Sequence, residues 1–483
     1  MTEPMNRRDF MKVAAVAGGG AVLASELAGR FAAAAEAAAA GAWPALPPVK
    51  VHKVFIGRTG GYMARPREET AKLNKYLDDL AAKLGDVTFV GGETIPGARA
   101  EDVAAKAVAD ADALLVVYLS GHGGEAPILG KLFDTGLPAV LFFQPFGGHG
   151  WMYFQNWRKQ DKRVVVLSTS DWGDLDRTVP LLRVPARMKR TKIFAVGGLR
   201  GTAAARSAEQ VKAKLGAEIV PLPNQRVMEV LQTIDPKVAE AEAEEYWIKP
   251  ARKIVEPKRQ EIIHSARYYL AMRELMIKEG AQAVASSLCM GNPRGCLTFS
   301  KLNDEGHVGA CEGDIDSTLT MLLFRYAFDV PGFISDPVVD TARNALVHFH
   351  CTCATKMDGP GGKRLPFVIR NQTDSGGGVA LQVANRIGQP VTCAKLVNLD
   401  TLLVCPGKII EISESPLACR TQFTQTVRDA RNLLLNWSAG AIKGDVMTML
   451  HRVVFYGDFA ARVRDLGDLM GLRVIEEGAP ALT

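Results

Sequence analysis

Short apolar runs rich in β-branched residues alternate with helical segments over the first third of the chain, and this alternation most constrains the fold. The apolar runs are 51–56, 87–90, 113–119, 139–143 and 164–167, with helical stretches such as 69–83 and 100–109 between them. Strands that alternate with helices are typical of a parallel sheet with crossover helices. The sequence therefore predicts a doubly wound, Rossmann-like α/β domain over 49–185.

The rest of the chain is predicted to form two further domains, since 483 residues exceed what one hydrophobic core serves. A second α/β domain is expected over 186–352, with strands at 193–196, 218–221 and 283–288 and a helix at 203–215. From 353 to 483 short strands dominate, which indicates an antiparallel sheet or small barrel. Two helices are expected within this β-rich domain, at 422–435 and at 459–470 before Gly471.

The N-terminus has the pattern of an export signal rather than of a folded element. Asn6-Arg7-Arg8-Asp9-Phe10-Met11-Lys12 resembles a twin-arginine motif, and a weakly apolar run over 13–24 follows it. We predict that residues 1–40 are a signal peptide and Ala-rich linker, the alternative being an Ala-rich disordered tail. The predicted location is the periplasm or another exported compartment, and the predicted partner is the twin-arginine translocation machinery.

The composition excludes two classes of partner. The apolar run at 13–24 is too short for a comfortable transmembrane helix, so no stable membrane span is expected once the signal is removed. A net charge of +6 is mild for this length, and no basic block interleaved with aromatic residues occurs. Nucleic-acid binding therefore has no support.

The stretch 307–350 holds the candidate site. Glu312 precedes a predicted helix, Asp336 follows a short strand at 333–335, and His348 and His350 lie on one face of the next strand. Carboxylates and imidazoles that meet are suitable ligands for a divalent metal ion. Each has a simpler structural alternative, since an acidic residue often caps a helix and a strand histidine is often a core residue. Asp314 and Asp316 are expected to be such caps.

Four short segments carry a resemblance to a known family. A-C-E-G-D-I at 310–315 is followed by V-P-G-F-I-S-D at 330–336, H-F-H-C-T stands at 348–352, and M-L-H-R-V-V-F-Y-G-D-F stands at 449–459. These segments resemble the active-site region of the L-fucose and L-arabinose isomerase superfamily, the metal-dependent aldose-ketose isomerases. The sequence departs from the family pattern at Leu450 and Thr352, which puts the identity of the sugar in doubt more than the metal.

The resemblance implies a metal-dependent isomerase of a monosaccharide that works through an enediolate. Glu312 and Asp336 would be catalytic carboxylates, and the divalent ion, most plausibly Mn²⁺, would bind Glu312, Asp336 and His451, with His350 as a fourth ligand. The family fold implied is two Rossmann-like α/β domains followed by a β-rich, barrel-like domain. Alternatives that stay open are a metal-dependent epimerase or lyase, and a non-catalytic exported sugar-binding protein on the same scaffold.

Glycine-rich loops after the predicted strands of the first domain offer further candidate sugar contacts. Arg58, His122 and Trp151 lie in or beside these loops, and His348 is a fourth candidate for substrate binding. Tight βα turns are the structural alternative for these loops. By resemblance, this domain closes the site of a neighbouring subunit, so a homo-oligomer, a trimer or hexamer, is expected. No G-x-G-x-x-G follows the first strand, so no nicotinamide cofactor is predicted.

All eight cysteines lie between Cys289 and Cys419. An exported protein can pair some of them, but a chain that folds before export need not. The spacing of Cys351 and Cys353 suits neither a relaxed disulfide nor a structural zinc site. Buried free thiols are therefore expected.

Overall fold

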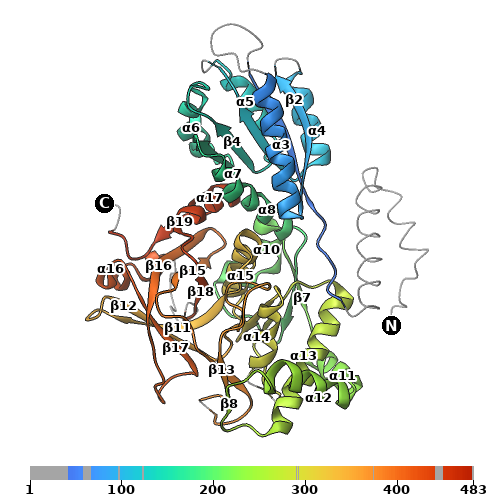
Figure 1. The fold of residues 1–483 in the computed structure, drawn as a ribbon, viewed down its shortest axis with the longest axis vertical. Coiled ribbons are helices and arrows are strands. Elements are labelled where there is room, and N and C mark those ends of the chain that lie inside the picture. The colour runs from blue at the N-terminus through green and yellow to red at the C-terminus, as the bar shows by residue number, and fades with distance from the viewer. Residues whose placement is uncertain are drawn as a thin grey trace, which may run out of the picture.

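The computed structural model describes residues 42–57, 67–95, 98–121, 124–289, 291, 293–373, 375–440 and 450–480. These residues form a five-stranded parallel sheet, a four-stranded parallel sheet and a barrel of mainly antiparallel strands (Figure 1). The predicted α/β class and the β-rich C-terminal part are both confirmed.

The first sheet has the order β2-β1-β3-β4-β5, with all neighbours parallel. Alternate residues of β1 face two separate cores: Val51 packs in a core with Leu77 of α3, and Val54 in a core with Val103 of α4. Helices therefore cover both faces, as a doubly wound sheet requires. The strands and helices of this part are β1 (Val49–Ile56), α3 (Arg67–Leu84), β2 (Val87–Ile95), α4 (Ala100–Asp110), β3 (Ala113–Tyr118), α5 (Ala126–Phe133), β4 (Ala139–Phe143), η1 (Gly150–Tyr153), α6 (Phe154–Lys159) and β5 (Val164–Ser168).

A bridge of short helices leads into the second parallel sheet, which has the order β10-β9-β6-β7. The elements are α7 (Gly173–Thr178), η2 (Val179–Leu182), α8 (Arg183–Met188), β6 (Lys192–Val196), α9 (Ala203–Arg206), α10 (Ala208–Leu215), β7 (Glu218–Pro221), α11 (Asn224–Thr233), α12 (Pro236–Glu242), the π-helical turn η3 (Ala243–Ile248), α13 (Arg259–Glu279), β9 (Ala283–Ser286), α14 (Cys296–Asp304), β10 (Val308–Cys311) and α15 (Ile315–Phe328). The helix predicted at 203–215 is interrupted at Ser207, which caps α10 by accepting a hydrogen bond from the Gln210 backbone N–H.

Six strands of the C-terminal part close into a ring. The pairing runs β15-β18-β11-β12-β17-β16, and β16 pairs with β15 again, so the predicted barrel is closed; β19 adds to β16 in parallel. The six barrel strands are β11 (Phe333–Asp340), β12 (Ala345–His350), β15 (Pro390–Val397), β16 (Thr401–Ile412), β17 (Thr421–Thr426) and β18 (Arg452–Tyr456), and the added strand is β19 (Arg473–Glu476). A small sheet of β8 (Lys253–Ile254), β13 (Phe367–Arg370) and β14 (Ala380–Val383) lies beside it, and the helices are α16 (Ala430–Leu435), η4 (Trp437–Gly440) and α17 (Ala460–Met470).

The structure corrects two predictions in this region. Residues 422–426, expected to begin a helix, form most of strand β17, because both β12 and β16 offer it backbone partners. The domain boundary predicted at 352 falls earlier, since β11 and β12 pair with β18 and β17 inside the barrel. Asp336 consequently lies within a strand, at the point where β11 changes its partner from β18 to β12.

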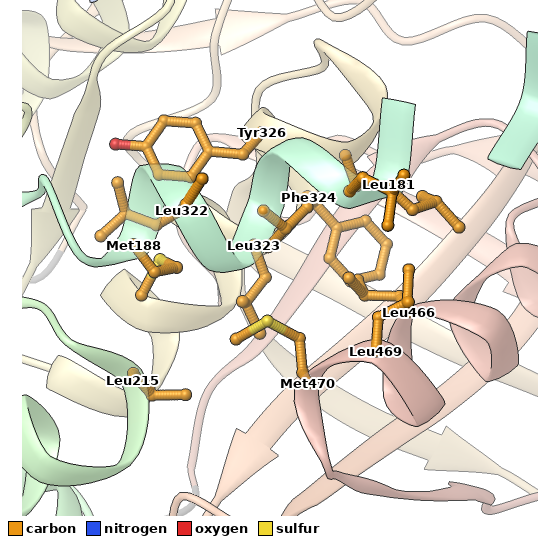
Figure 2. Close-up of a cluster of buried hydrophobic side chains, with 14 of the residues drawn as sticks. Leu181, Met188, Leu215, Leu322, Leu323, Phe324, Tyr326, Leu466, Leu469 and Met470 are labelled. Carbon is orange, nitrogen blue, oxygen red and sulfur yellow. The ribbon is translucent and has the colours of Figure 1, made fainter. Parts of the chain in front are cut away.

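Helix α15 connects the three parts. Figure 2 shows side chains of α15 in a buried cluster, with Phe324 near Leu181 of η2 and Leu466 of α17 and with Leu322 near Met188 of α8. Phe324 also stacks on Phe455 of β18, with ring centroids 3.9 Å apart. Because α15 begins three residues after Glu312, this shared core fixes where Glu312 lies relative to the barrel.

Candidate metal centre

Four predicted ligand residues come together between the second parallel sheet and the barrel. Glu312 follows β10 at the carboxyl end of the parallel sheet, Asp336 lies within β11, His350 ends β12, and His451 directly precedes β18. The barrel thus supplies three of the side chains and the parallel sheet supplies one.

The distances connect the four side chains through the two imidazole rings. His451 Nε2 lies 3.5 Å from Asp336 Oδ1 and 3.9 Å from Glu312 Oε2, and His350 Nε2 lies 3.9 Å from Glu312 Oε1. One donor atom each of Asp336, His350 and His451 lie within 4.8 Å of one another, and so do donor atoms of Cys311, Glu312 and His350. The predicted convergence of Glu312, Asp336, His350 and His451 is therefore present in the structure.

The backbone at Glu312 is unusual. Its φ is +58°, a left-handed conformation that is uncommon for a residue with a side chain, and Gly313 follows with φ +71°. A Cβ at residue 313 would lie 2.6 Å from the carbonyl oxygen of Gly198, so only glycine fits there. The tight pair of residues turns the chain from β10 toward α15.

His451 is oriented by a buried carboxylate that was predicted only as a helix cap. Asp314 does cap α15, because its Oδ1 accepts a hydrogen bond from the Ser317 backbone N–H. Its Oδ2 also lies 3.0 Å from His451 Nδ1 and pairs with Lys395 Nζ of β15. This contact leaves His451 Nε2 as the ring nitrogen that faces Glu312 and Asp336.

The charges around His451 shift its titration. Burial alone lowers the pKa of His451, but the hydrogen bond and negative charge of Asp314 outweigh burial and raise it above its ordinary value. Burial likewise opposes ionisation of Asp314, yet the Lys395 ammonium and His451 hold the pKa of this carboxyl well below its usual range. Asp314 is therefore a permanent negative charge behind the histidine.

The residues present fit a bound divalent cation. Within the described residues, the ligand atoms Asp336 Oδ1 and His451 Nε2 are buried and have no hydrogen-bond partner. Buried polar atoms are rarely left unsatisfied in native proteins. A histidine that ligates a metal commonly donates its other N–H to a carboxylate, as His451 can to Asp314. Two carboxylates and two imidazoles suit Mn²⁺ and similar ions.

Arg200 and Lys395 are site residues that the sequence did not indicate. Arg200 Nη1 donates a hydrogen bond to Glu312 Oε2 at 3.2 Å, and the Arg200 side chain is largely exposed. Lys395, fully buried on a barrel strand, contacts Asp314 and donates to Ser317 Oγ at 2.9 Å. Both contacts join segments about 80 or more positions apart, and no local motif marks either residue.

His348, predicted to contact the substrate, lies in the protein interior. His348 is fully buried, with Nδ1 2.7 Å from Ser335 Oγ and Nε2 3.1 Å from Gln425 Oε1, so both ring nitrogens are engaged. It shares a strand face with His350 as expected, but in a closed barrel that face points inward. Burial lowers the pKa of His348 to about 3.

The other predicted sugar contacts belong to the first α/β part. Trp151 lies in η1 and is about half exposed. The helix α6, which directly follows η1, lies in the upper part of Figure 1, away from the barrel strands. Arg58 and His122 lie outside the described residues. The eight cysteines carry no bond between them in this structure, and all but Cys419 are buried.

Comparison with known proteins identifies the N-terminal signal. Residues 4–24 match the family model described as the twin-arginine translocation pathway signal sequence. The chain is thus exported by the twin-arginine route, as the sequence predicts. None of the helices in the described residues combines the length and apolar character needed to cross a membrane. A search of curated proteins gives no match.

Several solved structures show a distant likeness. A carbohydrate transporter from Acidothermus cellulolyticus 11B, in complex with myo-inositol, is 12% identical, with 58% of this chain and 87% of that chain covered and a TM-score of 0.18. A solute-binding protein of an ABC transporter from Agrobacterium vitis, bound with α-D-tagatopyranose, is 12% identical, with coverages of 49% and 76% and a TM-score of 0.17. The periplasmic binding protein of the arabinose ABC transporter from Shewanella sp. ANA-3 is 13% identical, with coverages of 57% and 86% and a TM-score of 0.15. Scores this low carry no argument about function.

Proposed function

We propose that this exported protein is a metal-dependent aldose-ketose isomerase acting on a monosaccharide. The observation that carries the proposal is the cluster of Glu312, Asp336, His350 and His451, in which Asp336 Oδ1 and His451 Nε2 are buried without hydrogen-bond partners. A binding site for an uncharged sugar has no need of two carboxylates and two imidazoles around one point, whereas a cation does.

The residues of the cluster have three roles in this proposal: binding the ion, positioning His451 and transferring protons. Glu312, Asp336, His350 and His451 would hold the ion, and Asp314 would keep His451 in the tautomer that leaves Nε2 free to ligate. A bound Mn²⁺ supplies Lewis acidity, which makes the proton on the sugar's C2 more acidic. One of the two carboxylates removes that proton and a proton is then delivered to C1, so the carboxylates exchange base and acid roles.

Arg200 is placed to neutralise Glu312 and to contact a bound sugar. Its guanidinium neutralises Glu312 in the described arrangement, and its side chain is exposed enough to move aside. The same charge can then meet sugar hydroxyls as a hydrogen-bond donor.

The test combines metal analysis with a panel of aldoses. Purified protein is expected to contain about one divalent ion per chain and to convert an aldose to its ketose, with loss of activity in EDTA and recovery on adding Mn²⁺. Glu312→Gln is expected to lose both the ion and turnover. The exposed Glu209→Gln on α10 is the matched control and should keep both. A metal-free wild type that Mn²⁺ cannot activate on any aldose would sink the proposal.

The export signal favours a second candidate, a non-catalytic protein that captures a sugar outside the cytoplasm. Sugar binding that is tight, yields no product and is indifferent to EDTA would establish this function in place of the first. An epimer or a cleavage product in the same assays would instead point to a metal-dependent epimerase or lyase, since these reactions also pass through an enediolate.

A further inference from the structure

Four buried thiols lie in two close pairs beside the candidate metal centre. Cys289 Sγ is 3.2 Å from Cys311 Sγ, and Cys296 Sγ is 3.3 Å from Cys351 Sγ. Cys311 directly precedes Glu312, and Cys351 directly follows His350. The pairs thus flank two of the four predicted ligands.

The fold, rather than the order of cysteines along the chain, selects these pairs. Cys289 follows β9 and Cys311 ends the neighbouring strand β10, while Cys296 begins α14 and Cys351 follows β12 of the barrel. A disulfide needs its sulfur atoms about 2.05 Å apart, so each pair has only about 1 Å to close. Cys353 and Cys393 lie outside these two contacts, whereas Cys351 also interacts with Cys311 and Cys419.

The compartment supplies the oxidising condition. The twin-arginine signal at residues 4–24 directs the chain out of the reducing cytoplasm. Disulfides form and persist in oxidising compartments such as the bacterial periplasm. The two thiol pairs are in contact inside the exported protein but are buried, so their oxidation requires local opening that exposes them.

We propose that Cys289 with Cys311, and Cys296 with Cys351, form two disulfides in the exported protein. Each bond forms by thiol-disulfide exchange with a disulfide-bearing oxidoreductase of the compartment. The two protein thiols lose two protons and two electrons and become one disulfide, and the partner's disulfide is reduced to two thiols.

The first disulfide would stabilise the conformation of Glu312. The Glu312 backbone N–H donates a hydrogen bond to Cys289 Sγ at 3.2 Å, and Glu312 itself holds the left-handed φ of +58°. A bond from Cys289 to the preceding residue ties the loop after β9 to this strained turn. The second bond ties α14 of the α/β part to the end of β12, next to His350. This inference rests on the sulfur positions and the export signal and does not depend on isomerase activity.

Trypsin separates the four cysteines, which makes the pairing directly readable. Cleavage after Lys278, Arg294, Lys301, Arg325, Arg343 and Lys356 places Cys289 in peptide 279–294, Cys296 in 295–301, Cys311 in 302–325 and Cys351 in 344–356. Full-length protein is exported with its own signal, recovered from the periplasm, denatured with iodoacetamide and digested without reductant. The expected result is two linked species by mass spectrometry, 279–294 with 302–325 and 295–301 with 344–356. Because 344–356 also contains Cys353, fragment spectra must assign the bond to Cys351 and the alkyl group to Cys353.

Two outcomes would overturn the proposal. One is full alkylation of all four cysteines, both in periplasmic protein and after incubation with glutathione disulfide; stoichiometric zinc in that material would assign the thiols to a metal instead. The other is a different pairing, such as a bond to Cys353, which should be alkylated throughout.

A stability comparison checks the role of the bonds independently. Dithiothreitol is expected to lower the melting temperature of the wild type by more than about 5 °C, because each bond closes a loop of 20 residues or more. The control Cys353→Ala should keep this response, and the variant with Ser at 289, 296, 311 and 351 should lack it. A wild type unaffected by dithiothreitol would contradict the stabilising role.

Discussion

Single side chains decide whether the site can hold an ion, and Asp314 is the one whose effect is easiest to isolate. It touches no proposed substrate position, yet it contacts His451 Nδ1, Lys395 Nζ and the first turn of α15 at once. Its contacts to His451 and Lys395 link segments at 314, 395 and 451, so no local sequence pattern indicated them. The capping role, which depends on neighbours three residues away, was predictable and is confirmed.

Asp314→Asn separates the cap from the charge. Asparagine caps a helix about as well as aspartate, but it leaves the buried Lys395 without a carboxylate, so we expect a loss of roughly 3–5 kcal/mol of unfolding free energy. Metal affinity should fall by about 10–100-fold, because His451 loses its negatively charged partner. Denaturant unfolding and metal titration measure the two effects.

The double variant Asp314→Asn with Lys395→Met is the control for that experiment. Removing both charges should recover much of the stability, since no unpaired buried cation remains. Metal affinity should stay low. If the double variant binds metal as the wild type does, Asp314 has no positioning role.

His348 gives the barrel a specific sensitivity to acid. Its folded pKa is about 3, while an unfolded histidine titrates near 6.5. Below pH 6.5 the unfolded chain therefore takes up a proton that the folded chain refuses, and stability falls as the pH falls toward 3. Between pH 7 and 5 this residue alone should cost about 2 kcal/mol. In His348→Gln the loss over this range, measured by urea unfolding at each pH, should be smaller by that amount; an equal loss would contradict the assignment.

At the scale of elements, the sequence pattern predicted the helices and strands that local contacts determine. It failed for those that depend on pairing between distant segments. The five strands of the first sheet and the course of α15 were predictable, because apolar runs and helical spacing are local. Strand β17 was not, because T-Q-F-T-Q-T becomes a strand through partners at 345–350 and 409–412. The same reason explains Asp336, expected at a strand end but found where β11 changes partner.

Helix α15 should be the element whose core matters most for the whole protein. Phe324 is fully buried and contacts Phe455 and Phe459. Phe324→Ala is expected to cost about 3–5 kcal/mol of unfolding free energy, since the shared core cannot collapse around the void. Val108→Ala on α4, where the side chain is 58% exposed, should change stability by less than about 0.5 kcal/mol. Denaturant unfolding compares the two, and similar losses would contradict the central role of α15.

At the scale of the whole molecule, the export signal is separate from the fold it delivers. Arg7→Lys together with Arg8→Lys should keep the protein in the cytoplasm, because the twin-arginine pair is the feature that the export route recognises. Cell fractionation and immunoblotting measure the distribution. Arg30→Lys, outside the matched residues, is the control and should be exported normally; periplasmic accumulation of the double variant would contradict the prediction.

The division of the cluster between two bodies has a mechanical consequence. Glu312 belongs to the parallel sheet, whereas Asp336, His350 and His451 belong to the barrel. An ion bound by all four residues would therefore cross-link the sheet and the barrel. A chain in which the sheet and the barrel have not yet packed together would lack the complete ligand set. Ion binding would therefore stabilise, and report, the packed state. Because the twin-arginine route carries folded proteins, this protein would then be exported with the interface between sheet and barrel already cross-linked by the ion.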